Sequence, residues 1–121
     1  ADEVKIGPLP HVPQFRGWLN DLRRAIAAAS GRPQLAFKLI LEVEEQGVSF
    51  DSLSNGGDFE TLDARLYSAL RARIKSNLRR RAQRKEDELS TKKIMITGRQ
   101  ILYTIIVLVQ SYLRRRRAIR F

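Results

Sequence analysis

The fold is decided by residues 58–84, whose sequence is DFETLDARLYSALRARIKSNLRRRAQR. A leucine or isoleucine recurs there at every fourth position, from Leu62 to Leu78. This spacing predicts an amphipathic α-helix, because residues four apart share one face. Each step of four advances about 40° beyond a full turn. The apolar stripe is therefore expected to wind around the helix and to face a different neighbour at its far end.

The same stretch predicts where the helix begins and ends. Asp58 is expected to cap the first turn, where a carboxylate accepts free backbone N–H groups and is favoured by the helix dipole. No glycine or proline interrupts residues 58–97. The helix is therefore expected to run past Arg84, and Ser90-Thr91 is the expected break.

Basic residues dominate the second half of the stretch and the end of the chain. Such an element is expected to pack against protein at one end and to present positive charge to a polyanion at the other. The residues expected to contact the polyanion are Arg71, Arg73, Lys75, Arg79, Arg80, Arg81, Arg84, Arg114, Arg115, Arg116 and Arg117.

The formal net charge of +10 is unevenly distributed along the chain. Residues 1–64 contain six basic and ten acidic side chains, whereas residues 65–93 contain eleven basic and three acidic ones. This asymmetry indicates a polyanionic partner, which is a nucleic acid, an anionic membrane surface or an acidic protein. The alternative is a solvated basic face that has no partner.

Two further helices are predicted before residue 58. Residues 1–12 are expected to form an extended arm. A helix that starts at Pro13, with Phe15 and Trp18 in the core, is expected to end at Gly31, which suits the left-handed conformation just past a helix end. A second helix over residues 34–46 is apolar on most of its surface and is expected to be the most buried.

Three glutamates near the end of this second helix, Glu42, Glu44 and Glu45, raise the question of an acid–base or metal site. Neighbouring residues of a helix point in different directions, and the sequence contains no second carboxylate cluster that completes a site. We therefore expect a solvated helix end.

The last segment, residues 94–121, is expected to be an apolar helix with an arginine tail. Thr97 and Gln100 have the spacing of a capping box. Residues 94–113 are long enough to span a bilayer, but Arg99 and two glutamines lie inside and basic residues flank both ends. A buried core helix or an oligomer-forming helix is favoured, and a membrane location for residues 94–113 stays open.

These elements predict an all-α protein, a small helical bundle of four to five helices with a basic C-terminal helix or tail. The expected organisation is an arm over 1–12, a helical domain over 13–89 with a basic extension from residue 71, and the C-terminal helix and tail over 94–121.

Catalysis is not expected. The chain has no cysteine, and its single histidine, His11, lies among prolines near one end. It contains no nucleophile motif and no convergent carboxylate pair. We therefore expect no cofactor, no metal and no small-molecule substrate.

Several phrases of the chain resemble one family. They are Val12-Pro13-Gln14-Phe15-Arg16-x-Trp18, Ala28-Ala29-Ser30-Gly31-Arg32, Glu42-Val43-Glu44, Phe59-Glu60-Thr61-Leu62-Asp63-Ala64-x-Leu66 and Ala69-Leu70. In this order they resemble the Gag-like capsid segment of copia-type retrotransposons, as found in algal genomes, over residues 10–70. Thr97-Gly98-Arg99-Gln100-Ile101-Leu102 resembles a later phrase of such proteins, loosely over residues 97–113.

The resemblance implies that the domain over residues 13–89 is a Gag-like capsid module that self-associates and packages RNA without catalysis. Two departures matter. Residues 71–93 are richer in arginine than the family, and the Cys–His zinc knuckle that often accompanies Gag RNA binding is absent from this sequence. RNA binding then has to depend on the arginines.

The residues expected to pack, in the core or against other subunits, are Phe15, Trp18, Phe59, Leu62, Leu66, Ile101, Leu102, Ile105 and Val109. The first expected function is a non-enzymatic assembly module that binds RNA or another polyanion and contacts copies of itself or other subunits. The alternative is a small basic accessory subunit of a larger complex, for which a membrane-embedded complex is one option, with Ile101–Leu113 buried against subunits or lipid. The sequence does not decide the compartment: within a cell, both a cytoplasmic particle and an organellar complex fit.

Overall fold

The computed structural model describes residues 10, 14–55 and 57–119, the last four of them in backbone only. Five α-helices account for most of this part of the chain: α1 Phe15–Ala29, α2 Pro33–Leu41, α3 Glu60–Arg71, α4 Ser76–Thr91 and α5 Gly98–Ile119. Three short 3-10 helices, Glu42–Glu44, Asp51–Leu53 and Gly57–Phe59, lie between α2 and α3. The described residues contain no strand, so the all-α prediction is confirmed.

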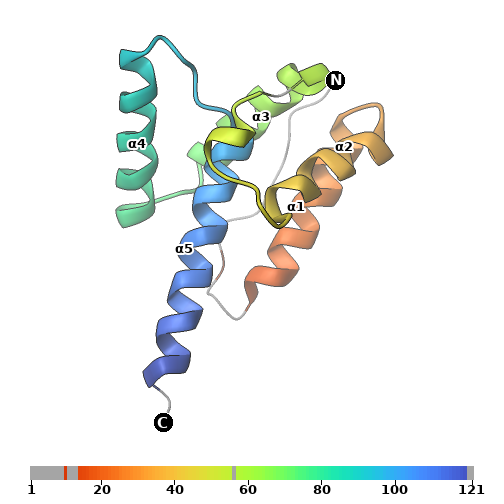
Figure 1. Cartoon of the computed structure of the whole chain (residues 1–121). Coiled ribbons are helices and arrows are strands. Elements are labelled where there is room, and N and C mark those ends of the chain that lie inside the picture. Colours follow the sequence, from red (N-terminus) through yellow and green to blue (C-terminus); the bar gives the residue numbers. More distant parts are fainter. Residues whose placement is uncertain (1–9, 11–13, 56, 120–121) are drawn as a thin grey trace.

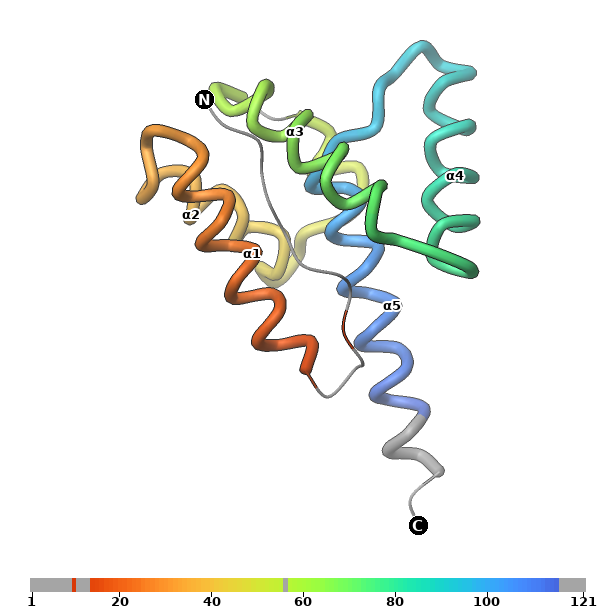
Figure 2. The backbone as a smooth tube through the Cα atoms, turned by 180° about the vertical axis from the view of Figure 1, so that it is seen from behind, coloured from red at the N-terminus to blue at the C-terminus, as the bar shows by residue number. Residues whose placement is uncertain are grey.

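The helices are arranged around the first half of α5 (Figure 1). Helices α3 and α4 both pack against it, and α1 packs against α2 and α3. The view from behind shows that α4 stands apart from the α1–α2 pair and that the second half of α5 extends away from the other helices (Figure 2). The C-terminal arginines are therefore carried on a projecting helix.

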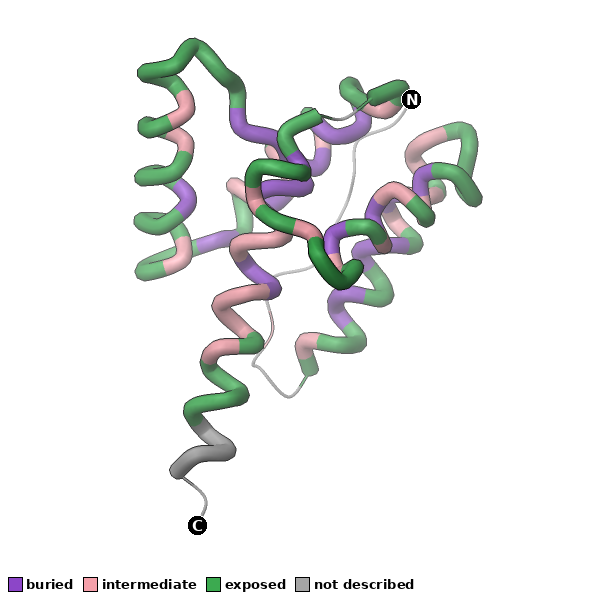
Figure 3. Tube along the Cα trace, in the orientation of Figure 1, coloured by how far each residue is buried: buried purple, intermediate pink, exposed green. Residues whose placement is uncertain are grey.

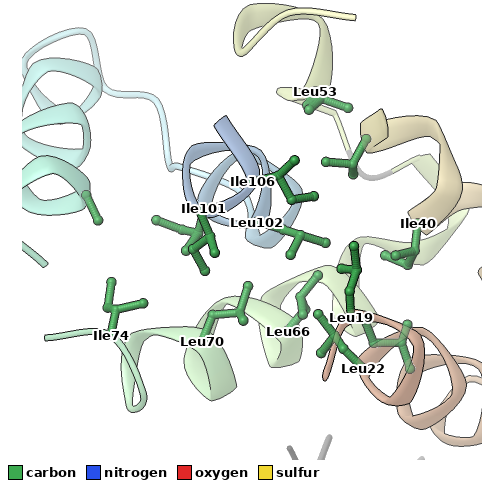
Figure 4. Close-up of a cluster of buried hydrophobic side chains, with 14 of the residues drawn as sticks. Leu19, Leu22, Ile40, Leu53, Leu66, Leu70, Ile74, Ile101, Leu102 and Ile106 are labelled. Carbon is green, nitrogen blue, oxygen red and sulfur yellow. The ribbon is translucent and has the colours of Figure 1, made fainter. Parts of the chain in front are cut away.

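One hydrophobic core connects these helices (Figure 4). Leu66 and Leu70 of α3 and Leu102 of α5 are fully buried, and leucines of α1 complete the contact from the other side. Burial is concentrated where α5 passes α3, whereas most of α4 and the end of α5 are exposed (Figure 3). The core residues are Trp18, Leu19, Leu22, Ile26, Ala36, Ile40, Val43, Leu53, Leu62, Leu66, Leu70, Ile74, Ala82, Ile96, Ile101, Leu102, Ile105 and Ile106.

The prediction of one helix from residue 58 past Arg84 is wrong. Helix α3 ends at Arg71, and α4 begins at Ser76, which has a φ of 54° although it is not a glycine. The turn between them buries Ile74. An unbroken helix would have rotated the apolar stripe away from α5. The break instead allows α3 and α4 to pack against the same helix, so the expected change of neighbour does not occur.

Asp58 does not cap the third helix. It lies in the 3-10 turn Gly57–Phe59, α3 begins only at Glu60, and no side chain caps this end. The prediction placed the N-cap one residue early, since Phe59 occupies this position. The predicted end of the next helix is confirmed, since α4 stops at Thr91.

The second helix is shorter and less buried than predicted. Helix α2 ends at Leu41, only Ala36 and Ile40 are fully buried, and Leu35 is 51% exposed. Its apolar residues surround the helix on several sides, but its main packing partner is α1. The most buried helical segment is the start of α5 instead.

Two local predictions are confirmed. Gly31 has a φ of 75°, the left-handed conformation expected just past the end of α1. Thr97 and Gln100 form the capping box: the Thr97 N–H donates to Gln100 Oε1 at 2.9 Å, and the Gln100 N–H donates to Thr97 Oγ1 at 3.1 Å.

The start of α5 is held by a contact that the sequence did not predict. Asp63 of α3 is 7% exposed and accepts hydrogen bonds from the N–H groups of Gly98, at 2.7 Å, and Arg99, at 3.0 Å. Burial raises the pKa of the Asp63 carboxyl, and these two backbone N–H groups oppose the shift. At Gly98 a Cβ atom would lie 2.5 Å from the Asp63 carbonyl oxygen, so only glycine fits this approach of the two helices.

Within the described ranges, no helix has the length and apolar character that crossing a bilayer requires. Apart from Pro10, the predicted arm over residues 1–12 lies outside the part of the chain that the structure describes, as does Pro13.

Candidate functional site

Helix α4 presents arginines on the side opposite its buried face. Ala82 is buried against the core, with Leu78 and Leu89 partly buried beside it. Successive residues of an α-helix are about 100° apart, so Arg80 and Arg84 project roughly opposite to Ala82. Both are exposed.

Arg81 of α4 and two arginines of α5 line one hollow. It has a volume of about 380 Å³, and its remaining lining residues are Leu108 and Ser111 of α5. The two arginines of α5 are Arg114 and Arg115, and all three arginines are exposed. The fold therefore brings Arg81 together with Arg114 and Arg115, which are far from it in the sequence.

We define the α4–α5 basic surface as Arg80, Arg81, Arg84, Arg114 and Arg115. In the part of the chain that the structure describes, none of these five side chains forms an ion pair or a hydrogen bond. Their charge is therefore available to an external anion.

Arg79 lies on another side of α4, although it adjoins Arg80 and Arg81 in sequence. It is on the flank of Gln83, whose Oε1 accepts a hydrogen bond from Arg71 of α3 at 2.6 Å. Arg73 and Lys75 are exposed in and beside the turn between α3 and α4. None of these three cations lines the hollow.

Arg71 differs from the other predicted polyanion-binding residues. Its side chain is 19% exposed, and its Nε lies 3.5 Å from Glu86 Oε1 of α4. The Tyr67 hydroxyl donates to the other oxygen of Glu86 at 2.7 Å. Burial and this carboxylate raise the pKa of Tyr67, and Arg71 opposes the shift. Arg71 therefore joins α3 to α4.

The last two predicted arginines, Arg116 and Arg117, continue α5 in backbone, and their side chains lie outside the described residues.

Most of the predicted packing residues are used inside this chain. Trp18, Leu62, Leu66, Ile101, Leu102 and Ile105 are at most 8% exposed. Phe15, Phe59 and Val109 are partly buried against the same core, and Phe15 stacks on Trp18 with ring centroids 5.5 Å apart. These side chains thus leave little area for another subunit.

The glutamates near the end of α2 are not simply solvated, which corrects the prediction for two of them. Glu42 Oε1 accepts a hydrogen bond from Arg99 Nη1 at 3.0 Å. Glu44 pairs with the buried Arg23, whose pKa is lowered by burial and by the neighbouring Arg16. Only Glu45 is exposed without such a partner among the described side chains.

A second hollow, of about 650 Å³, lies between α1 and α2. It is lined by Asn20, Arg23, Arg24, Ala27, Ala28, Pro33, Gln34 and Phe37. Asn20 Oδ1 accepts a hydrogen bond from Arg23 at 3.0 Å, and Glu44 holds the same guanidinium. The most buried charge of this hollow is thus already neutralised within the chain.

No group of three or more His, Asp or Glu side chains that could hold a metal ion occurs in the described ranges. Comparison of the chain with protein families, characterised proteins and solved structures finds no match.

Proposed function

We propose that this chain is a non-enzymatic helical module that binds RNA through the α4–α5 basic surface. The observation that carries this proposal is the convergence of exposed arginines from two helices, none of them paired with an acid of the described chain, on one hollow. Guanidinium groups pair with phosphate in a fork geometry and stay charged at all physiological pH values.

The order of charges along α4 supports a role in binding. A helix dipole favours acidic side chains at the N-terminus and basic ones at the C-terminus. Helix α4 has the opposite order: its arginines start at residue 79, and its acids, Glu86, Asp87 and Glu88, lie in the second half. The arginines are therefore not placed to stabilise the helix, which favours an external partner.

The lining of the hollow favours binding that tolerates different sequences. No aromatic ring lines it, and arginine contacts to phosphate carry no sequence information. RNA is the polyanion we favour because of the resemblance of residues 10–70 to a Gag-like capsid segment. Self-association of a Gag-like module belongs to the same proposal, and its contact surface would have to lie outside the buried core residues.

The test is a fluorescence-anisotropy titration of labelled single-stranded RNA across a series of salt concentrations. We expect tight binding at low salt and a linear fall of log K with log salt, because each phosphate contact releases counterions. The variant Arg80→Gln/Arg81→Gln/Arg84→Gln should reduce the slope by about 2, since each contact to a single strand contributes about 0.7.

The matched control is Arg16→Gln/Arg24→Gln/Lys38→Gln, which removes the same number of charges from exposed positions on α1 and α2. It should leave the slope nearly unchanged. Equal losses in both variants would show that net charge rather than this surface drives binding. Absence of binding at low salt, or a flat salt response, would overturn the proposal.

A second candidate function is an accessory subunit that meets lipid or another protein through α5. Ile101, Leu102 and Ile105 are buried by the chain itself, so this candidate is limited to the projecting end of the helix. Tyr112 and Leu113 are 43% and 41% exposed there, next to the arginines. Flotation with vesicles of anionic lipid tests this candidate function. The candidate is supported if the chain floats with the vesicles and the Leu113→Gln variant does not. It fails if the chain stays at the bottom of the gradient.

A further inference from the structure

We propose that the hollow between α4 and α5 is a subsite for one unpaired nucleotide, and that it makes the basic surface prefer single-stranded over double-stranded RNA. This inference depends on the proposed function, because it specifies which form of RNA the same surface binds.

The size of the hollow fits a single nucleotide. Its volume of about 380 Å³ falls in the range of about 300–1,000 Å³ that is typical of small-ligand sites. A duplex keeps its bases paired and stacked inside and presents phosphates and 2′-hydroxyls outside. A single strand can turn one base out into a hollow of this size. Only the single strand therefore gains from the concave shape.

The lining also suits a nucleotide. Leu108 offers an apolar contact to a base, and the planar guanidinium of Arg81 can stack on it. Ser111 is partly buried and supplies a hydroxyl that can donate to or accept from a base edge or a 2′-hydroxyl. No acidic side chain lines the hollow.

The geometry of α5 places the phosphate-binding groups beside this base site. Ser111, Arg114 and Arg115 are three and four residues apart, so they share one face of the helix. Arg81 approaches from α4 and completes the lining. A base on Leu108 would thus have its own phosphate within reach of arginines from both helices. The larger hollow between α1 and α2 lacks this feature, because its two arginines, Arg23 and Arg24, both come from α1 and Arg23 is held by Glu44 and Asn20.

The experiment compares two RNAs with the same number of phosphates, an unstructured single strand and a blunt duplex, by fluorescence anisotropy at one salt concentration. We expect the single strand to bind about tenfold more tightly, because only its unpaired base can stack on the Arg81 guanidinium and contact Leu108. Inorganic polyphosphate, which has charge but no base, should compete more strongly against the duplex than against the single strand.

The variant Ser111→Leu fills the hollow without a change in charge. It should abolish the preference for the single strand and leave duplex binding and its salt dependence intact. The control is Ser68→Leu, at an exposed serine of α3. Thermal melting of both variants shows whether they are folded.

The outcomes separate the two proposals. Equal, salt-dependent binding of both RNAs to the unmodified chain overturns the nucleotide subsite and leaves the proposed function standing. A preference that survives in a folded Ser111→Leu variant also overturns the subsite. Failure of both RNAs to bind at low salt overturns the proposed function and the subsite with it. Both proposals are supported if the preference for the single strand is lost in Ser111→Leu and kept in Ser68→Leu.

Discussion

Replacement of Asp63 by alanine should destabilise the fold by about 2–4 kcal/mol. The carboxylate accepts two backbone hydrogen bonds from the first turn of α5, and the residue is 7% exposed. A buried donor that loses its partner costs about 1–3 kcal/mol, and two such donors are affected. The raised pKa shows that burial of the carboxylate is itself unfavourable, so part of this loss is recovered.

A destabilisation of this size is measurable, because small domains have a total stability of about 5–15 kcal/mol. The Asp63→Ala variant should remain folded at low temperature and melt roughly 10 °C lower than the unmodified chain. Urea titration followed by circular dichroism at the helical band provides the free energy of unfolding. Asp63→Asn keeps one acceptor oxygen, so its free energy of unfolding should lie between those of Asp63→Ala and the unmodified chain.

The matched control is Asp58→Ala. Sequence patterns favour Asp58 as the cap of α3, but in the structure no side chain caps this helix. The substitution should therefore change the midpoint of unfolding by no more than the error of the measurement. The reasoning is refuted if Asp63→Ala costs less than about 1 kcal/mol, below the penalty for even one buried unpaired donor, or if Asp58→Ala costs as much as Asp63→Ala.

Three further predictions concern the same junction. Gly98→Ala should cost at least about 2 kcal/mol of stability, because its Cβ would lie 2.7 Å from the Tyr67 amide nitrogen. Gly17→Ala in α1, where a Cβ would meet no neighbouring element within 4 Å, should instead stabilise the fold by up to about 1 kcal/mol. Urea titration of both variants measures these opposite changes. Arg99→Met should cost about 1–3 kcal/mol by the same assay, since it leaves the Asn55 carbonyl, 2.6 Å from Nη2, without its donor. The lost ion pair with Glu42 should add little, because the Glu42 side chain is 48% exposed. The folded-state pKa of Asp63 is raised above 3.8, so the folded form binds this proton more readily than the unfolded form. As the pH falls from 7 toward 4, the free energy of unfolding of the unmodified chain should therefore rise relative to that of Asp63→Asn. A shift in the opposite direction contradicts the raised pKa.

Local patterns predicted the features that neighbouring residues determine. The capping box of Thr97 and Gln100, the left-handed Gly31 and the stripe from Leu62 to Leu70 all depend on residues within one or two turns of one another. The all-α class follows from the same signals. Each is confirmed because its physical cause lies in the local chain.

The contacts that fix the position of α5 could not be predicted in this way. Asp63 and Arg99 are 36 residues apart, and Arg99 and Glu42 are 57 apart. Each side chain has an ordinary local interpretation, as a helical acid, a helical base or a solvated glutamate. Only the approach of α3 and of the 3-10 helix Glu42–Glu44 to the start of α5 brings them together. The break between α3 and α4 was missed for a related reason, since it is set by contact with α5 rather than by a glycine or a proline.

The arginines divide into two groups that composition does not distinguish. Arg23, Arg71 and Arg99 are each largely buried and meet a glutamate of another element, so they hold the fold together. This division shows why consecutive arginines in a sequence do not by themselves identify a binding surface. Arg71, at the start of the basic run, is structural, and Arg79 lies about 200° around α4 from Arg81.

Pairing of the buried arginines with the acids of the first half of the chain leaves the α4–α5 basic surface uncompensated. Glu42 and Glu44 are occupied by Arg99 and Arg23, and the acids of α4 face Tyr67, Gln83 and Lys85. Like charges held close together repel and weaken the elements that hold them. A polyanion bound there removes that repulsion, and a ligand that binds only the folded chain stabilises it by mass action. Under the proposed function, a bound polyanion should therefore stabilise the fold, because the arginines that would contact its phosphates are the ones that repel one another without it.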